Sequence, residues 1–352
     1  MSFLIQQTLL YAIPLMIVAL AGVFAERSGI INLALEGIMI FGAFIGVLFV
    51  HVCQKYGVFT LIVNDGMTNW GTMQFFEILG MLASALLGAL FALLLGFASI
   101  HLKADQTITG TSLNMLAPAL VLFLVRLIAN QEELRLYTGD AAGWFMVKKS
   151  MFGFAKDEGG FFVNTFLHKF YIATYICILL FVLCSIILYK TKFGLRLRSC
   201  GENPQAAGSL GINVFKMRYS GVLISGALAG MGGFVYALTT SNCMANGDVA
   251  GFGFLALAVM IFGNWKPLNI AGAALLFGLF KCLAAGYASI DINGDGIKLL
   301  EQLSKDPTWG KVLNPNLYRM LPYLISLIVL AFTSKKSRAP KAEGQPYDKG
   351  MR

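Results

Sequence analysis

Charged residues are scarce in this chain of 352 residues. Asp, Glu, Lys and Arg together make up 13% of the sequence, while 57% of it is hydrophobic. Soluble domains contain about 25% charged and about 45–50% apolar residues, so a soluble fold could not bury this much apolar surface. The composition therefore excludes a set of ordinary soluble domains and predicts a single helical bundle in lipid.

The usual signatures of catalytic and metal sites are also missing. The sequence has no G-x-x-x-x-G-K-[ST] phosphate loop, so the chain cannot bind ATP in the usual way, and it has no H-E-x-x-H zinc motif. The three histidines, His51, His101 and His168, are scattered along the chain. The six cysteines form no C-x-x-C pair and show no metal-ligand spacing. These absences predict that the chain is not an enzyme and holds no cofactor or metal.

Lys and Arg are absent before Arg27, so the N-terminus lacks the basic region of a cleaved signal peptide. Residues 3–24 are therefore expected to remain as a first membrane span. Similar apolar stretches recur, and about 20 such residues cross a hydrocarbon core about 30 Å thick. The predicted spans are 3–24, 29–50, 76–100, 107–130, 170–189, 219–240, 246–264, 268–290 and 316–333.

Helices satisfy their own backbone hydrogen bonds within a membrane, so these spans predict an all-α polytopic transmembrane bundle of about 9–10 spans. The seventh span is the weakest of the set. Its unbroken apolar part runs only from Gly251 to Gly263, about half of a membrane-crossing length, so this segment could be re-entrant. The second span carries Asn32 and Glu36 after Gly29 and could also be broken.

The distribution of Lys and Arg sets the expected orientation, because cytoplasmic loops of membrane proteins are enriched in these residues. The two most basic segments are the loop 190–218 and the tail after Thr333, and placing both in the cytoplasm is consistent with the spans between them. This orientation places the long loop 131–169 outside. Nine spans leave the N-terminus outside, whereas a missed or broken span would reverse its side. We predict a membrane domain over 1–333 and a loose, basic cytoplasmic tail over 334–352.

Small residues recur at four-residue spacing in two predicted spans, and such residues let helix backbones approach closely. They are Gly80, Ser84, Gly88 and Gly96 in one span and Gly226 and Gly230 in another. Glycine is also common in membrane helices generally, so a single pair indicates little. The longer run predicts a close contact between helices.

The loop 190–218 carries helix signals of its own. Asn203 followed by Pro204 is typical of an N-cap and a first helical residue, and Gly208 and Gly211 are candidates to end the helix. Connections between packed helices usually take about 2–8 residues, so this loop is longer than a connection requires. It is either a basic loop held against anionic lipid or a docking helix. The punctuation by Asn, Pro and Gly favours the docking helix.

Four segments, spread along the chain in order, resemble one family. They read ERSGIINLALEGIMIFGAF at 26–44, ADQTITGTSLNMLA at 104–117, GLRLRSCGENPQAAGSLGINV at 194–214 and GNWKPLNIAGAALLFG at 263–278. These segments resemble the permease subunits of ABC importers for simple sugars, nucleosides and branched-chain amino acids, and most of all the nucleoside branch. The fourth segment departs from the family pattern at Asn269, where the family has a small residue.

The resemblance implies a permease subunit that forms the pathway for nucleosides, or related simple sugars, across a bacterial cell membrane. Its loop helix would seat in a groove of a partner ATP-binding subunit, and ATP and Mg would bind to that partner. The resemblance also implies a second permease, expected to be a non-identical homologue, and an extracellular substrate-binding lipoprotein. It assigns to the coupling element Arg196, Arg198, Gly201, Glu202, Asn203, Pro204, Ala206, Ala207 and Gly211.

Polar residues inside predicted spans are candidates for the transport pathway, because such groups are costly in lipid. Asn32 and Glu36 are four residues apart and share a helix face, and Thr111 and Asn114 lie in the fourth span. Three of them have an alternative role. Glu36 could equally pair with Arg27 near the cytoplasmic end, and Thr111 and Asn114 could equally hydrogen-bond neighbouring helices.

Two cations and one acidic turn remain. Arg126 is expected near the outer end of its span, whereas Lys281 lies deeper with no evident partner. The segment from Asp291 to Gly296 matches the first half of a calcium loop, but Gln302 stands where that motif has Glu, so a glycine-rich turn is favoured.

The main alternative function is an ion-coupled secondary transporter of small polar solutes. That class needs charged or carboxylate groups near the membrane midplane, and only Glu36 and Lys281 are candidates. A membrane enzyme is disfavoured because no catalytic constellation is present.

Overall fold

The computed structural model describes residues 2–58, 70–153, 160–167, 169–286 and 339–348, together with positions 317, 320, 321, 324, 325, 327 and 331. Seven helices in this part of the chain are long and apolar enough to cross a membrane. They are α1 (Ser2–Arg27), α2 (Leu35–Lys55), α3 (Trp70–Ile100), α4 (Gln106–Ala129), α7 (Ile172–Lys190), α10 (Val214–Thr239) and α12 (Pro267–Gly286). The predicted all-α, multi-pass architecture is confirmed.

Shorter helices lie between the long ones. At one end of the bundle are α5 (Ala141–Trp144), the 3-10 helix η1 (Lys149–Phe152) and α6 (Phe161–Phe166), and at the other end are α8 (Lys192–Glu202) and α9 (Pro204–Ser209). Helix α11 (Phe252–Phe262) is apolar but too short to span, so the predicted span 246–264, the weakest of the set, is replaced by this short helix. The predicted span 316–333 lies largely outside the described residues, and the calcium-loop candidate Asp291–Gly296 lies wholly outside them.

Several predicted spans start elsewhere: α3 begins at Trp70 instead of 76, and the starts of α2 and α10 have identifiable local causes. Helix α2 begins at Leu35, because the chain leaves the helical path after α1 and Gly29 adopts a positive φ of 97°. Helix α10 begins at Val214, five residues before the predicted start, where the Asn213 side chain accepts a hydrogen bond from the Lys216 amide at 3.0 Å. Asn213 is a good N-cap residue, so this boundary was readable in the sequence.

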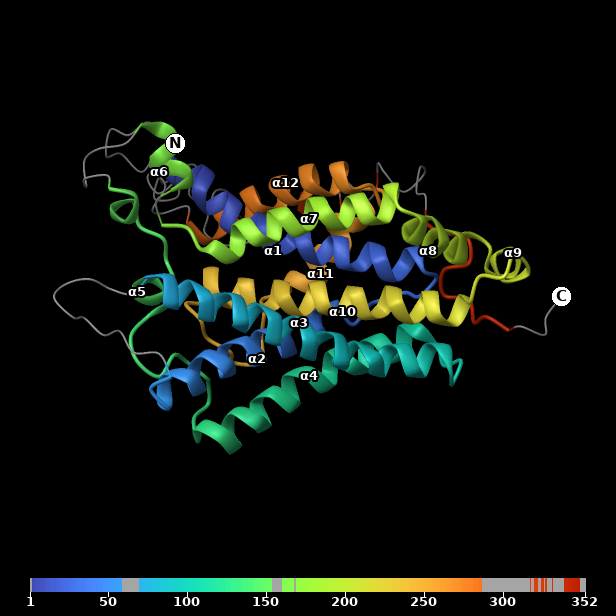
Figure 1. Cartoon of the computed structure of the whole chain (residues 1–352), viewed down its shortest axis with the longest axis horizontal. Coiled ribbons are helices and arrows are strands. Elements are labelled where there is room, and N and C mark those ends of the chain that lie inside the picture. Colours follow the sequence, from blue (N-terminus) through green and yellow to red (C-terminus); the bar gives the residue numbers. More distant parts are fainter. Residues whose placement is uncertain are drawn as a thin grey trace.

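Helix α10 lies in the middle of the bundle and packs against α1, α2 and α3 (Figure 1). Helices α7 and α12 lie on the α1 side, and α4 lies at the edge beyond α2. Most of the length of α10 is buried, whereas most of the α4 surface remains exposed. The fold therefore has a central helix that contacts α1, α2 and α3, and a peripheral helix with a free face.

The contact between α3 and α10 depends on glycine. A Cβ atom at Gly88 would come within 2.7 Å of the Gly226 carbonyl oxygen and 2.8 Å of the Gly230 Cα atom. A Cβ atom at Gly230 would collide with the Ser84 carbonyl oxygen in turn. These distances are shorter than carbon atoms tolerate, so the two backbones touch directly. The predicted close contact of the Gly80–Gly96 run is confirmed, and its partner is the Gly226–Gly230 pair.

Polar side chains tie the outer connections to the helix ends. Gln54 of α2 donates to the Thr138 carbonyl at 3.3 Å and accepts from the Tyr137 amide at 2.8 Å. The backbones of Leu134 and Ala245 exchange two hydrogen bonds of 2.9 Å. The segment from 130 to 153 is therefore fixed on the bundle end at which α2 finishes.

Replacing Gly230 with Ala should destabilise the bundle. The added methyl would overlap the α3 backbone, and overpacking of this kind costs about 1–3 kcal/mol. The matched control is Gly272→Ala in α12, where nothing lies within 4 Å of the added carbon. Thermal unfolding in detergent should show a lower Tm for Gly230→Ala and no loss for Gly272→Ala. Equal Tm values for the two variants would contradict the glycine contact.

Candidate functional site

The candidate coupling element consists of two helices at the basic end of the bundle (Figure 1). Helix α8 starts directly after α7, and the Thr191 hydroxyl between them accepts from the Gly194 amide at 3.2 Å. The chain then breaks at Asn203, whose side chain accepts from the Ala206 amide at 3.0 Å, and Pro204 opens α9. The predicted N-cap and proline start are confirmed. Helix α8 was missed, because its sequence was read only as a basic approach to α9.

Gly201 and Glu202 attach the end of α8 to the end of α1. A Cβ atom at Gly201 would come within 2.9 Å of the Arg27 carbonyl carbon, so only glycine fits there. The Arg27 guanidinium pairs with the Glu202 carboxylate at 3.2 Å. Arg27 was the alternative partner considered for Glu36, and this pairing shows that the alternative is wrong.

The predicted coupling residues divide into a buried and an exposed set. Gly201 and Ala207 are buried, and the Arg198 guanidinium stacks on Tyr189 at 4.9 Å. Arg196, Asn203, Ala206 and Gly211 are exposed. Leu210, which the sequence reasoning did not include, is 81% exposed directly after α9. A leucine so exposed on a polar loop indicates a binding surface. The exposure is known only from the fold and could not be inferred from the sequence pattern.

Residues 339–348, here named the C-terminal strap, lie across this element. The Ala342 amide donates to the Gly201 carbonyl at 2.9 Å, and the Gly344 amide donates to the Gly29 carbonyl at 3.3 Å. The Arg218 guanidinium of α10 donates to the Gln345 carbonyl at 2.9 Å. The expectation of a loose tail is therefore wrong for the strap.

The end of the strap packs on α9. Tyr347 is buried with Cys200, Ala207 and Val214, and its ring meets the Phe215 ring at a centroid distance of 5.3 Å. Beside it, the Gln205 side chain donates to the Asp348 carbonyl at 2.9 Å. The Asp348 carboxylate also pairs with Lys103, just before α4, at 2.7 Å. The strap thus connects α9 with the starts of α4 and α10.

The carboxyl group of Glu343 in the strap lies next to the carboxyl group of Glu26 near the end of α1. Burial raises the pKa of Glu343 to about 7, and the neighbouring Glu26 carboxyl and the Arg27 charge oppose part of that rise. The strap therefore docks most favourably with Glu343 protonated, since ionising a buried carboxyl without a full partner is costly.

The break before α2 is held by its own Asn32 side chain, which reaches α10, and by the Asn114 side chain of α4. Asn32 donates to the Ser225 hydroxyl of α10 at 2.8 Å and accepts from the Ala34 amide at 3.1 Å. Asn114 of α4 donates to the Leu33 carbonyl at 2.7 Å and accepts from the Gly37 amide at 2.8 Å. Both side chains therefore make interhelical hydrogen bonds. A pathway role for Asn32 and Asn114 stays a prediction.

Thr111 and Glu36, the other pathway candidates, lie in different surroundings. Thr111 is exposed on α4 and bonds only the Thr107 and Ile108 carbonyls of its own helix, both at 3.0 Å. The buried Glu36 carboxylate accepts from the amides of Gly251, Gly253 and Phe254 at 3.0, 2.6 and 3.1 Å. The carboxylate satisfies amide groups at the start of α11 that have no partner within the helix. A negative charge is favourable at a helix N-terminus.

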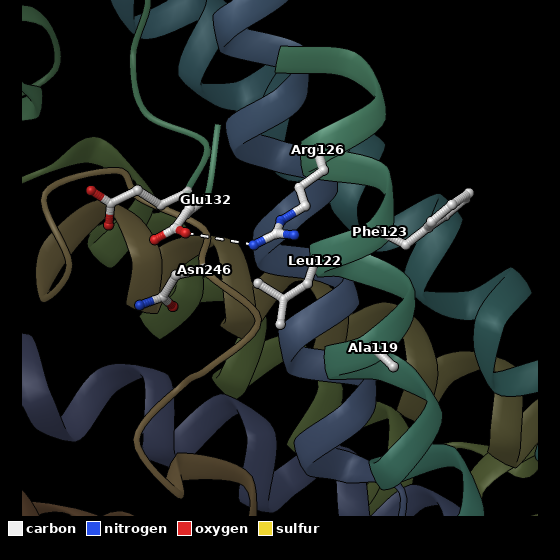
Figure 2. Close-up of a pocket in the computed structure, with 7 residues that line it drawn as sticks. Ala119, Leu122, Phe123, Arg126, Glu132 and Asn246 are labelled. Carbon is white, nitrogen blue, oxygen red and sulfur yellow. Dashed lines mark ion pairs between the residues drawn. The ribbon is translucent and has the colours of Figure 1, made fainter. Parts of the chain in front are cut away.

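The two intramembrane cations have identifiable partners. Lys281 of α12 donates to the Ala250 carbonyl at 3.2 Å and lies 5.0 Å from the centre of the Phe252 ring, so the lack of a partner inferred from sequence is corrected. Arg126 lies in the last turn of α4, as predicted, and pairs with Glu132 at 3.5 Å with both side chains largely exposed (Figure 2). This pair borders a cavity of about 800 Å³ that Ala119, Leu122 and Phe123 also line.

The sequence of this chain resembles those of known transport proteins along most of its length. Residues 4–330 match the family described as branched-chain amino acid transport system / permease component. The guanosine ABC transporter permease protein NupQ of Bacillus subtilis is 38% identical over 100% of this chain and 98% of its own length. The nucleoside ABC transporter permease protein NupC of Lactococcus lactis is 38% identical over 99% and 98%.

A second permease of Bacillus subtilis is more distant. The guanosine ABC transporter permease protein NupP is 23% identical over 79% of this chain and 73% of its own length. No solved structure matches the chain.

Docking of the strap should weaken as pH rises from about 4.5 to about 7. The pKa of Glu343 is about 7 in the docked strap and near 4.5 when free, so undocking releases a proton in that interval and becomes more favourable with rising pH. Hydrogen exchange of residues 339–348, corrected for intrinsic rates, should show falling protection up to about pH 7 and a plateau above it. Glu343→Gln should remove most of this dependence, and an unchanged profile in that variant would contradict the assignment.

Proposed function

Because the chain belongs to the family of branched-chain amino acid transport permease components, we propose that it is the transmembrane permease of an ATP-driven importer for nucleosides. The observation that carries the proposal is the α8–α9 pair, whose exposed tip projects from the basic end of the bundle while its base is packed on α1 and α10. The nucleoside class is supported by the two relatives that match over nearly their whole length. The membrane would be the bacterial inner membrane.

The catalytic chemistry would belong to a partner. The chain has no phosphate loop, so ATP and Mg would bind to ATP-binding subunits docked on Ala206, Leu210 and the neighbouring exposed residues of α8 and α9. A displacement of α9 would be transmitted to α1 through α8, whose Gly201 contacts the Arg27 backbone. It would be transmitted to α10 through the connection that follows α9. Packed helices shift as rigid bodies between discrete arrangements, so a small displacement at α9 would alter the bundle.

A second, non-identical permease would complete the pathway, and an extracellular binding lipoprotein would deliver the substrate. The two Bacillus subtilis permeases with guanosine names, NupQ and NupP, resemble this chain to different degrees, which supports an unlike pair. Helix α4 supplies the free face for it. Half of the α4 residues are exposed, Thr111 among them, so this face has room for a partner helix or an aqueous path. Asn32, Glu36 and Asn114 would hold the helices beside that path.

An ion-coupled transporter is the alternative that the geometry favours less. It requires a carboxylate that exchanges ions near the membrane midplane, whereas the Glu36 carboxylate is occupied by three backbone amides. Guanosine uptake into vesicles that contain the assembled importer should require ATP and survive collapse of the proton gradient. Uptake driven by an ion gradient without the ATPase would refute the proposal.

Replacing Leu210 with Glu should weaken ATPase docking. The side chain is 81% exposed, so the Tm should not change, while removal of an anchoring contact typically weakens an interface by about tenfold or more. The matched control is Leu102→Glu, which changes a leucine that is 65% exposed in the turn between α3 and α4. Co-purification of the ATP-binding subunit measures the effect. Equal retention by both variants would exclude Leu210 from the docking surface.

A further inference from the structure

A second cavity, of about 510 Å³, opens where α11 begins. Its lining comes from α1, α10, α11, α12 and the segment before α11: Tyr11, Tyr236, Thr240, Ala250, Phe252, Lys281, Ala284 and Ala285. This volume falls within the roughly 300–1,000 Å³ of small-molecule sites. Helix α11 has 11 residues, about 16 Å at 1.5 Å per residue. Transporters often place substrate at such interrupted helices.

The cavity extends from the middle of the bundle to the end away from α8 and α9, where α10 ends at Thr239 and α12 at Gly286. Helix α11 ends beside Trp265, whose indole donates to Glu26 at the end of α1. Counted from that end, Phe252 lies about 16 Å into a hydrocarbon core about 30 Å thick, and Tyr11 lies about 24 Å in. The cavity therefore occupies the middle and the far half of the bilayer. It is distinct from the charged cavity at Arg126, which lies at the end of α4 (Figure 2).

One wall of the cavity is aromatic. The Tyr236 and Phe252 rings are buried and lie 4.5 Å apart, and the Tyr11 ring lies 6.3 Å from Phe252 and is partly exposed. Tyr11 therefore offers a partly exposed ring beside the buried Phe252 ring, which in turn packs on Tyr236. A flat π surface of this kind binds planar heterocycles by stacking.

Polar side chains also line the cavity. They are those of Thr240 and Lys281, and the Lys281 ammonium contacts the Ala250 carbonyl at 3.2 Å and lies 5.0 Å from the centre of the Phe252 ring. Glu36 lies on the other side of the same turn and binds its amides. Lys281 is the one charged side chain among the described lining residues, and its ammonium already contacts the Ala250 carbonyl. The described lining therefore offers hydrogen-bonding groups beside an aromatic wall and no carboxylate for the amine of an amino acid.

We propose that this cavity is a transit site for the base of a nucleoside, with the base stacked on Tyr11 and its polar edge toward Thr240 and Lys281. The inference rests on the proposed function and adds to it the place at which this chain recognises the substrate. An aromatic wall with a few hydroxyl and ammonium donors matches a neutral heterocycle. A simple sugar has no planar ring, and a zwitterionic amino acid would need unpaired charges.

The test uses the assembled importer in vesicles, with ATP inside and radiolabelled guanosine or ribose outside. Tyr11→Leu should lower guanosine kcat/KM by about tenfold, the size expected from loss of one stacking contact, while Tyr11→Phe should retain uptake. The matched control is Phe75→Leu in α3, a phenylalanine that is 57% exposed and does not line this cavity. It should leave uptake unchanged. Basal ATP hydrolysis and Tm should be the same for all variants.

The Thr240→Val variant is a second test of the site, because valine keeps the shape of the side chain and removes its hydroxyl group. It should raise the KM for guanosine about threefold with kcat unchanged, because it removes a hydrogen-bonding group and not a structural one. This variant tests the site even where Tyr11→Leu fails to fold.

The outcomes separate the two proposals. If the wild-type importer takes up guanosine and both Tyr11→Leu and Thr240→Val behave like it, the site is wrong and the function stands. If Tyr11→Leu lowers ribose and guanosine uptake equally, base stacking is wrong. If the wild-type importer carries no nucleoside, the proposed function fails first.

Discussion

The direct backbone contact of α10 with α3 and α2 is the constraint on which the rest of the structure depends. Gly226 and Gly230 lie against Gly88 and the Ser84 carbonyl, and Gly233 lies against the Met39 backbone. Lipid provides no hydrophobic drive for helices to associate, so close packing must supply it. Helix α10 also begins a short connection after α9 and ends just before the segment that leads to α11. A central helix held this closely can transmit displacement between both ends of the bundle.

Two interruptions of the helical path have backbone polar groups that side chains from distant segments satisfy. The break before α2 receives side-chain amides from α4, and the start of α11 receives the Glu36 carboxylate. Unsatisfied backbone groups within a bilayer cost several kcal/mol each. Glu36 is therefore fixed by a segment more than two hundred residues away, and Lys281 is fixed by the same turn. These contacts join α2, α11 and α12 around the aromatic cavity.

The sequence predicted the features that local chemistry determines. Asn203 and Pro204 start a helix because capping requires only neighbouring residues, and span lengths follow from hydropathy. The partners of Glu36, Lys281 and Tyr347 depend on contacts between distant segments, so no local pattern disclosed them. The strap was misjudged for the same reason, since its polar composition hides the one buried tyrosine. Leu210 was missed because exposure is a property of the fold.

The central claim is that force on α9 changes the accessibility of the membrane interior. Ala250 lines the aromatic cavity and is exposed, so a cysteine placed there reports its access to a membrane-impermeant thiol reagent in the assembled importer. The account predicts that ATP changes the labelling rate of Ala250→Cys in the wild-type background, and that Leu210→Glu abolishes the change. An ATP-dependent change that persists unaltered with Leu210→Glu, or no change with ATP at all, would contradict it.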